Sequence, residues 1–217
     1  MSTKIKIDVV SDVVCPWCIV GYKRLEKAIA ELDIADKIEL EWQPFELNPA
    51  MPTEGENINE HLTKKYGSSA EDNARNRANL TSLGAAEGFT FDFYDAMRIV
   101  NTREAHVLLD YAKESGKQTA LNIRLITAFY SERKDVSDRA ILAEELKTVG
   151  LNVEEGLARL DAPNSKADIH TKENYWHEMG ISGVPTVVFN RTSALTGAQP
   201  LETYKQVLTE LLRAPNS

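Results

Sequence analysis

The stretch Cys15-Pro16-Trp17-Cys18 decides the fold, and it contains both cysteines of the 217-residue chain. Before it, residues 4–10 alternate between apolar and charged side chains, which predicts a β-strand. After it, apolar residues recur at helical spacing over residues 17–32, and a proline suits the first turn of a helix. The motif is therefore predicted to lie where a strand ends and a helix begins.

The placement of the two cysteines predicts chemistry rather than cross-linking. A disulfide between residues so near in sequence closes almost no loop and adds little stability. Exchange between thiols and disulfides needs a thiolate, which the unpaired N–H groups and partial positive charge of a helix N-terminus stabilise. We therefore predict Cys15 as the attacking sulfur, with a pKa below that of a free cysteine. Cys18 is predicted as the resolving sulfur that displaces a mixed disulfide.

Two other uses of the cysteine pair compete with redox chemistry. Half of a zinc site would recruit two of the four histidines, but none of these shows the close spacing of a zinc finger. Cysteines also occur as inert buried residues. Because a Pro-Trp pair at a helix start favours redox use, we predict a redox pair and no metal site. The histidines are His61, His106, His170 and His177.

A second motif, Gly183-Val184-Pro185-Thr186, leads directly into an apolar strand pattern at 187–189. Alone, a plain turn before a strand explains it. Beside a pair of redox cysteines, a cis peptide bond before Pro185 would present the backbone of Val184 to an extended substrate. We therefore predict that Val184 and Pro185 contact substrate.

Residues around the cysteines carry further predictions. Pro16 and Trp17 separate the two sulfurs and are candidate substrate contacts, although Trp17 is equally well interpreted as a cap on the core. Asp8 or Asp12 either accepts a proton from the resolving thiol or caps a loop. His106 is expected on the surface of a helix or at the edge of the core.

Strand signals lie at both ends of the chain and helical signals lie between them. A second strand is predicted at 38–45, helices follow over 57–180, and strands and a last helix return after 185. One sheet built from both ends fits this order. The predicted domains are therefore a discontinuous α/β domain, residues 1–48 and 166–217, and a helical insertion, residues 49–165.

Composition limits the partners and the compartment. The net charge is −8 and the sequence pI is about 5.1, which disfavours nucleic acid as a partner. No apolar run approaches the roughly 20 residues of a membrane span, and the N-terminal residues lack the apolar core of a signal peptide. We therefore expect a cytoplasmic protein without a membrane partner, where such a cysteine pair is more often catalytic or metal-binding than structural.

Three segments together resemble the DsbA-like thioredoxin-fold family, and within it the FrnE-like branch of mostly cytoplasmic members. They are Asp-Val-Val-Ser-Asp-Val-Val-Cys-Pro-Trp-Cys at 8–18, Glu-Trp-Gln-Pro-Phe-Glu-Leu-Asn-Pro at 41–49, and Gly-Val-Pro-Thr at 183–186. The resemblance spans nearly the whole chain. It implies an α/β thioredoxin-like fold with a large α-helical insertion and a cis bond before Pro185. Some members carry additional cysteines, and this chain has none, so it implies no second redox centre.

The resemblance also implies an activity: a thiol–disulfide oxidoreductase that oxidises, reduces or isomerises disulfides of proteins or small thiols. It assigns Cys15 as nucleophile, Cys18 as resolving thiol, and Val184 with Pro185 as the substrate loop. No cofactor is expected beyond the redox-active Cys15–Cys18 disulfide, with glutathione open as a co-substrate. The alternatives are a glutathione-dependent isomerase or transferase of the kappa-like group, and a zinc-binding or chaperone-like module. The direction of electron flow and the choice between monomer and homodimer stay open.

Overall fold

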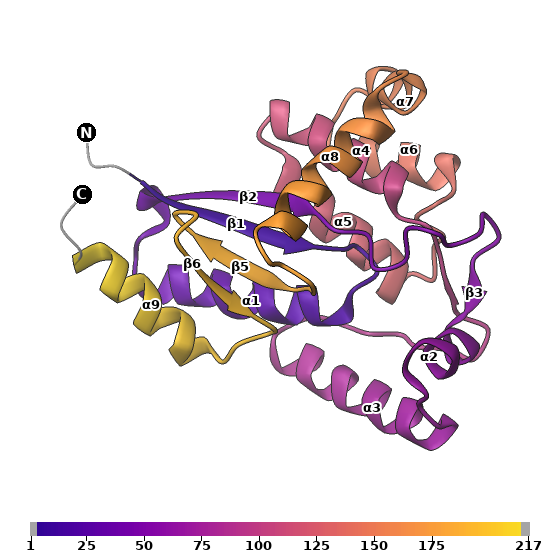
Figure 1. Cartoon of the computed structure of the whole chain (residues 1–217), viewed down its shortest axis with the longest axis horizontal. Helices are drawn as coiled ribbons and strands as arrows, with labels where there is room; N and C mark the ends of the chain where they lie inside the picture. The colour runs from indigo at the N-terminus through magenta and orange to yellow at the C-terminus, as the bar shows by residue number, and fades with distance from the viewer. Residues whose placement is uncertain (1–3, 214–217) are drawn as a thin grey trace.

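The sheet joins the two ends of the chain, as the sequence predicts. The computed structural model describes residues 4–213, and its main sheet has the strand order β2-β1-β5-β6 (Figure 1). Strands β1 and β2 are parallel, whereas β5 is antiparallel to β1 and β6 is antiparallel to β5. The four strands are β1 (Ile5–Ser11), β2 (Ile38–Pro44), β5 (Thr186–Phe189) and β6 (Ser193–Thr196).

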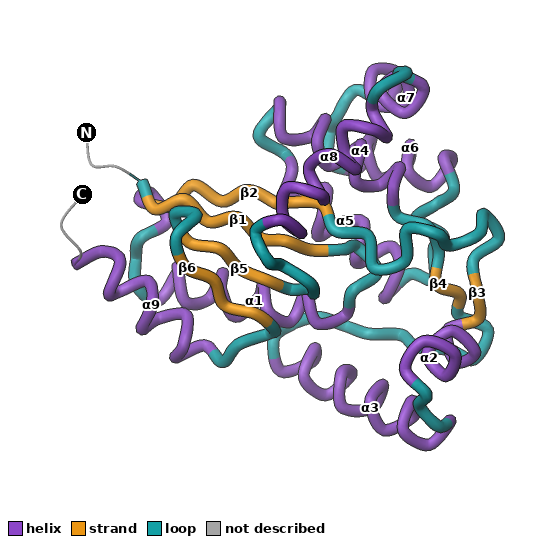
Figure 2. Tube along the Cα trace, in the orientation of Figure 1, coloured by secondary structure: helices purple, strands orange, loops and turns teal. Residues whose placement is uncertain are grey.

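Helices α1 (Pro16–Glu31) and α9 (Leu201–Arg213) lie side by side along the sheet (Figures 1 and 2). Their apolar faces join the main core, with Leu25 from α1 and Leu208 from α9 fully buried. A short 3₁₀ turn, Ala35–Lys37, connects α1 to β2. The strand–helix–strand unit around the cysteines is thus a parallel βαβ crossover.

A block of helices packs against the edge strand β2. The side chain of Gln118 accepts a hydrogen bond from the backbone N–H of Trp42 at 2.9 Å and donates one to its carbonyl at 3.0 Å. This amide therefore substitutes for a neighbouring strand at an otherwise open sheet edge. The helices are α4 (Arg103–Glu114), α5 (Gln118–Ser131), α6 (Arg139–Thr148), α7 (Val153–Asp161) and α8 (Ser165–Glu178).

Two further helices, α2 (Ile58–Tyr66) and α3 (Ala70–Ala86), form an arm at the cysteine end of α1 (Figure 1). A two-stranded ribbon of β3 (Glu56–Asn57) and β4 (Arg98–Ile99) ties the ends of this arm together. The sequence predicts only helices here, because two-residue strands are too short to show an alternating pattern.

One cluster of buried apolar side chains runs from the sheet into the helical block. The predicted insertion, 49–165, contains β3, α2, α3, β4 and α4 to α7, and α8 begins at its last residue. The division of the chain into two domains at these boundaries stays a prediction. Every helix within residues 4–213 is too short or too polar to cross a lipid bilayer.

Candidate redox site

Both cysteines lie at the N-terminus of α1, where the sequence places them. Cys15 is the N-cap residue, Pro16 is the first helical residue, and the N–H of Cys18 donates to the carbonyl of Cys15 at 3.1 Å. The two thiols are free and buried, with Cys15 3% exposed and Cys18 fully covered. The pair is therefore asymmetric, because only Cys15 retains any contact with solvent.

The second motif meets the first across the sheet. Strand β5 pairs with β1 through Val10 and Thr186, which brings the loop before β5 to the start of α1. The predicted cis bond between Val184 and Pro185 is present. The thiol of Cys15 donates to the carbonyl of Val184 at an Sγ–O distance of 3.8 Å. The backbone of Val184 is thus adjacent to the sulfur of Cys15, and its contact with substrate stays a prediction.

The protonation of Cys15 differs from the sequence-based expectation. Burial raises the pKa of the Cys15 thiol well above its ordinary value, and the hydrogen bond and charge of Cys18 act in the same direction. The backbone N–H of Cys18 lowers this pKa, and the charge of Asp12 raises it further. The prediction of a lowered pKa considered the helix N-terminus but not the desolvation of the sulfur. We therefore expect the thiolate to form when water or substrate reaches the cavity beside it.

A cavity of about 380 Å³ opens beside Cys15, between the start of α1 and the arm of α2 and α3. Trp17 is 39% exposed and forms part of its wall, which fits a position beside the substrate better than a cap on the core. The sequence does not predict the contribution of the arm to this site. From α1 and its flanks the lining is Val14, Cys15, Pro16, Trp17 and Val184, and from the arm it includes Ile58, His61, Leu62, Lys65, Asn73, Asn76, Arg77 and Leu80.

The two candidate acids occupy different places. Asp8 is buried in β1, where the side-chain amide of Gln43 donates to it at 2.7 Å. Asp12 is buried in the loop that leads to the cysteines, and its backbone carbonyl accepts the N–H of Cys15 at 3.0 Å. Its carboxylate accepts from the N–H of Leu47 at 2.8 Å. Of the two acids, Asp12 is the one tied directly to the thiol loop.

His106 is buried at 3% exposure, although the sequence suggests a surface or edge position. Its Nε2 lies 3.3 Å from Oδ1 of Asp12, an ion-pair distance without hydrogen-bond alignment. Glu46 and Glu173 lie nearby, and their charges raise the pKa of the same imidazole. The carboxylate of Glu173 accepts the backbone N–H of Glu46, and Arg103 pairs with Glu46 at 2.8 Å. A buried charge cluster therefore joins the thiol loop to α4 and α8.

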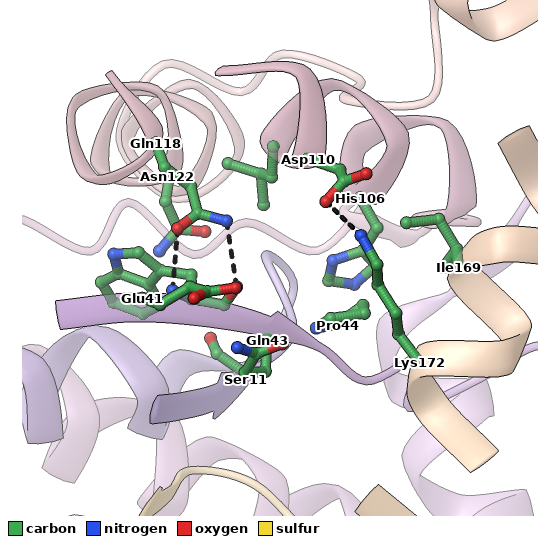
Figure 3. A pocket seen from close by; sticks show the side chains of 12 residues that line it. Ser11, Glu41, Gln43, Pro44, His106, Asp110, Gln118, Asn122, Ile169 and Lys172 are labelled. Atoms are coloured by element: carbon green, nitrogen blue, oxygen red, sulfur yellow. Dashed lines mark hydrogen bonds and ion pairs between the residues drawn. The ribbon is translucent and has the colours of Figure 1, made fainter. Parts of the chain in front are cut away.

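Figure 3 shows the other side of this cluster, a small hollow between β2 and helices α4, α5 and α8. His106 lies in its wall, Gln118 braces the strand, and Asp110 pairs with Lys172 beside it. The hollow has room for about 10 Å³ and does not reach the cysteines' cavity through any shared lining residue. The two cavities are therefore separate.

The zinc alternative gains no support from the histidines. His61 lines the cavity of Cys15, but its Nδ1 pairs with Glu56 at 2.7 Å. His177 contacts the carbonyl of Ile181 through its Nδ1 at 3.1 Å. Across the part of the chain that the structure describes, no three His, Cys, Asp or Glu side chains group as metal ligands would.

The fold and the paired cysteines define a thioredoxin-type protein with a dithiol site. The DSBA-like thioredoxin domain model matches residues 6–209. The structure is similar to that of a probable DsbA oxidoreductase from Streptomyces coelicolor, with a TM-score of 0.91 and 33% identity, covering 98% of this chain and 93% of that one. The chain therefore belongs to the DsbA-like thioredoxin domain family, a family of thiol oxidoreductases; the FrnE-like branch stays a prediction.

Two more distant structures share the fold. The cytosolic disulfide reductase DsbM from Pseudomonas aeruginosa, solved with GSH, has a TM-score of 0.65 and 17% identity, covering 96% of this chain and all (100%) of DsbM. A 2-hydroxychromene-2-carboxylate isomerase has a TM-score of 0.70 and 15% identity, covering 96% of each chain. These two likenesses show the fold alone.

Proposed function

We propose that this chain is a thiol–disulfide oxidoreductase in which Cys15 attacks the substrate and Cys18 resolves the mixed disulfide. The observation that carries the proposal is the position of Cys15, at the N-cap of α1, beside the carbonyl of Val184 and open to the cavity. Helix N-termini stabilise the thiolate that exchange requires. The fully covered Cys18 is suited to react only within the protein.

The reaction balances without a further cofactor. The thiolate of Cys15 attacks one sulfur of a substrate disulfide, forms a mixed disulfide and releases the first substrate thiolate. The thiolate of Cys18 then attacks Sγ of Cys15 and releases the second. Two electrons pass from the cysteines to the substrate, which takes up the two thiol protons. The reverse sequence oxidises a dithiol substrate.

Reduction of insulin disulfides tests this proposal. We expect wild-type protein to catalyse the reaction, Cys15→Ser to be inactive, and Cys18→Ser to accumulate a mixed disulfide that mass spectrometry detects. Activity that survives Cys15→Ser would show that the cysteine pair is not the reaction centre.

We further propose a cytoplasmic protein that acts on protein or small-molecule thiols, with glutathione as a co-substrate. The fold likeness to DsbM, a cytosolic reductase solved with GSH, supports this proposal. The reduction potential of Cys15–Cys18 against glutathione tests the direction of exchange. A potential near about −270 mV indicates a reductant and one near about −120 mV an oxidant.

A glutathione-dependent isomerase of the kappa-like group is the second candidate. The fold likeness to the chromene-carboxylate isomerase and the cavity beside Cys15 favour it. Such chemistry activates the sulfur of glutathione and does not need Cys18. Glutathione-dependent turnover of a small aromatic substrate by Cys18→Ala would therefore support this candidate over the oxidoreductase.

A further inference from the structure

The cavity beside Cys15 has a charge opposite to that of the whole chain. The protein carries 33 acidic and 25 basic residues. None of the acidic residues lines this cavity, whereas Lys65 and Arg77 both do. A site from which acidic side chains are absent, in a protein of net charge −8, fits an anionic ligand.

The face of α3 toward the cavity is polar where a packed helix is normally apolar. Asn73, Asn76, Arg77 and Leu80 all line the cavity, at the three- and four-residue spacing that places side chains on one helix face. Only the last of these is apolar. The polar stripe therefore contributes to the cavity wall, with Asn73 buried, Arg77 half-buried and Asn76 exposed.

Asn73 is a buried donor without a partner. Its side chain is 2% exposed, and Oδ1 accepts a hydrogen bond from the hydroxyl of Ser68 at 2.7 Å. Its Nδ2 has no hydrogen-bond partner among the described residues. An unpaired buried N–H is costly, and such groups in native proteins call for a specific explanation. An acceptor on a bound ligand would satisfy it.

The two cations of the cavity are not equivalent. The ammonium of Lys65 donates to the carbonyl of Leu47 at 2.7 Å and to the side chain of Asn48 at 2.8 Å. Lys65 therefore stabilises the wall of the cavity through these two hydrogen bonds. One N–H of Arg77 donates to Asn59 at 2.9 Å, which leaves further donors of its planar guanidinium for a ligand. Arg77 lies one helical turn from Asn73, and a planar guanidinium can bind a carboxylate through two parallel N–H groups.

Much of the remaining wall is apolar. A cavity of about 380 Å³ is in the size range of small-molecule sites, which begins at roughly 300 Å³. The apolar side chains that line it include Trp17, Ile58, Leu62, Leu80 and Phe93.

We infer that this cavity binds a small thiol, or its disulfide, that has an apolar body and a carboxylate. Asn73 and Arg77 hold the carboxylate while the sulfur of the ligand reaches Cys15. The inference rests on the proposed function and names its substrate class. Each turnover with a disulfide of this class releases two ligand thiols and leaves Cys15 and Cys18 joined, so the electron balance is the one given above.

Two chromogenic disulfides separate recognition of the carboxylate from reactivity of the sulfur. Dithiobis(nitrobenzoate) carries a carboxylate on each ring, whereas dipyridyl disulfide has neutral rings. The measurement is the single-turnover rate of coloured thiol release from reduced, full-length protein. We expect Arg77→Gln to slow the carboxylate probe about tenfold, as loss of one charge-assisted hydrogen bond predicts, and to leave the neutral probe within about twofold.

Two further variants complete the test. Asn73→Leu should also slow only the carboxylate probe, and Arg77→Lys should restore part of the rate. Arg75→Gln is the matched control, because it removes the same charge from the same helix. Arg75 pairs with Asp72 and does not line the cavity. It should affect neither probe beyond the small effect of a surface charge.

Distinct outcomes would overturn the inference and the proposed function. If Arg77→Gln slows both probes equally, or slows neither, the inferred carboxylate site is wrong. The proposed exchange chemistry would not be affected by either result. If Arg77→Gln slows exchange with glutathione disulfide but not with the aromatic carboxylate, the requirement for an apolar body is wrong. If Cys15→Ser reacts with both probes as fast as wild type, the proposed function itself fails.

Discussion

His106 on α4 places its Nε2 3.3 Å from Oδ1 of Asp12, and both side chains are buried. Asp12 precedes Cys15 by three residues, and its backbone carbonyl accepts the N–H of Cys15. The helical block is therefore linked to the thiol loop through a pair of ionisable groups. The protonation of this pair has consequences for stability and for the reactivity of the thiol.

The first prediction concerns stability against pH. Burial alone lowers the pKa of His106, but the adjacent carboxylate of Asp12, together with the charges of Glu173 and Glu46, outweighs burial and holds this pKa above its ordinary value. A raised folded-state pKa contributes stability below the unfolded value of about 6.5, and this contribution is lost as pH rises through the folded value. The free energy of unfolding of wild type relative to His106→Gln should therefore fall as the pH rises above about 6.5.

Urea denaturation at several pH values measures this difference. His170→Gln is the control, because His170 is exposed on α8 and its Nδ1 is 3.9 Å from Glu173. Its difference from wild type should stay small across the range, as for a surface pair. A constant difference between wild type and His106→Gln would show that the imidazole contributes packing but no charge.

The second prediction concerns the reactivity of Cys15. Burial is the largest cause of its raised pKa, and the charge of Asp12 adds to it. Asp12→Asn removes that charge and should move the pH midpoint of Cys15 alkylation downward. Asp8→Asn is the matched control, because Asp8 is equally buried but does not act on Cys15. If both variants moved the midpoint equally, general loosening of the core would explain the change.

The position of the redox pair could be predicted because its signals are local. A strand pattern, two cysteines and a proline at the first helical turn define the junction, and the proline before β5 marks the loop that meets it. The burial of His106 was missed because its partners, Asp12, Glu46 and Glu173, come from three distant segments. The spacing of apolar residues along one helix cannot show which charged side chains from other segments will pack against that helix.

The cavity could not be predicted for a similar reason. On α3 the positions of Asn73 and Arg77 suggest a solvated face, and only the packing of the arm against α1 turns that face inward. One feature of the sequence does indicate a polar cavity wall. The helix α3 has no continuous apolar stripe, although a helix of this length normally packs through one. The prediction of a lowered pKa for Cys15 was wrong because the burial that raises this pKa is a result of tertiary packing, which the local sequence does not show.

The third prediction concerns the packing of this arm. A Cβ at Gly84 would lie 2.5 Å from the ring of Phe91 and 2.8 Å from the carbonyl oxygen of Phe89. Helix propensity favours alanine by about 1 kcal/mol, but the backbone oxygen cannot move aside, and overpacking costs about 1–3 kcal/mol. Gly84→Ala should therefore lower the free energy of unfolding. Gly183→Ala, where the added methyl meets nothing within 4 Å, is the control, and similar losses in both would contradict the steric argument.

The last prediction separates the two interpretations of Trp17. Its ring is 39% exposed and lines the cavity, so Trp17→Ala should change the free energy of unfolding by no more than about 1 kcal/mol. A Trp that caps the core would instead cost about 3–5 kcal/mol. Because the ring provides apolar surface beside Cys15, we expect the same variant to slow exchange with aromatic disulfides more than with small polar ones. Denaturation curves and single-turnover rates on one preparation test both expectations, and a large loss of stability with equal slowing of all substrates would support the core cap.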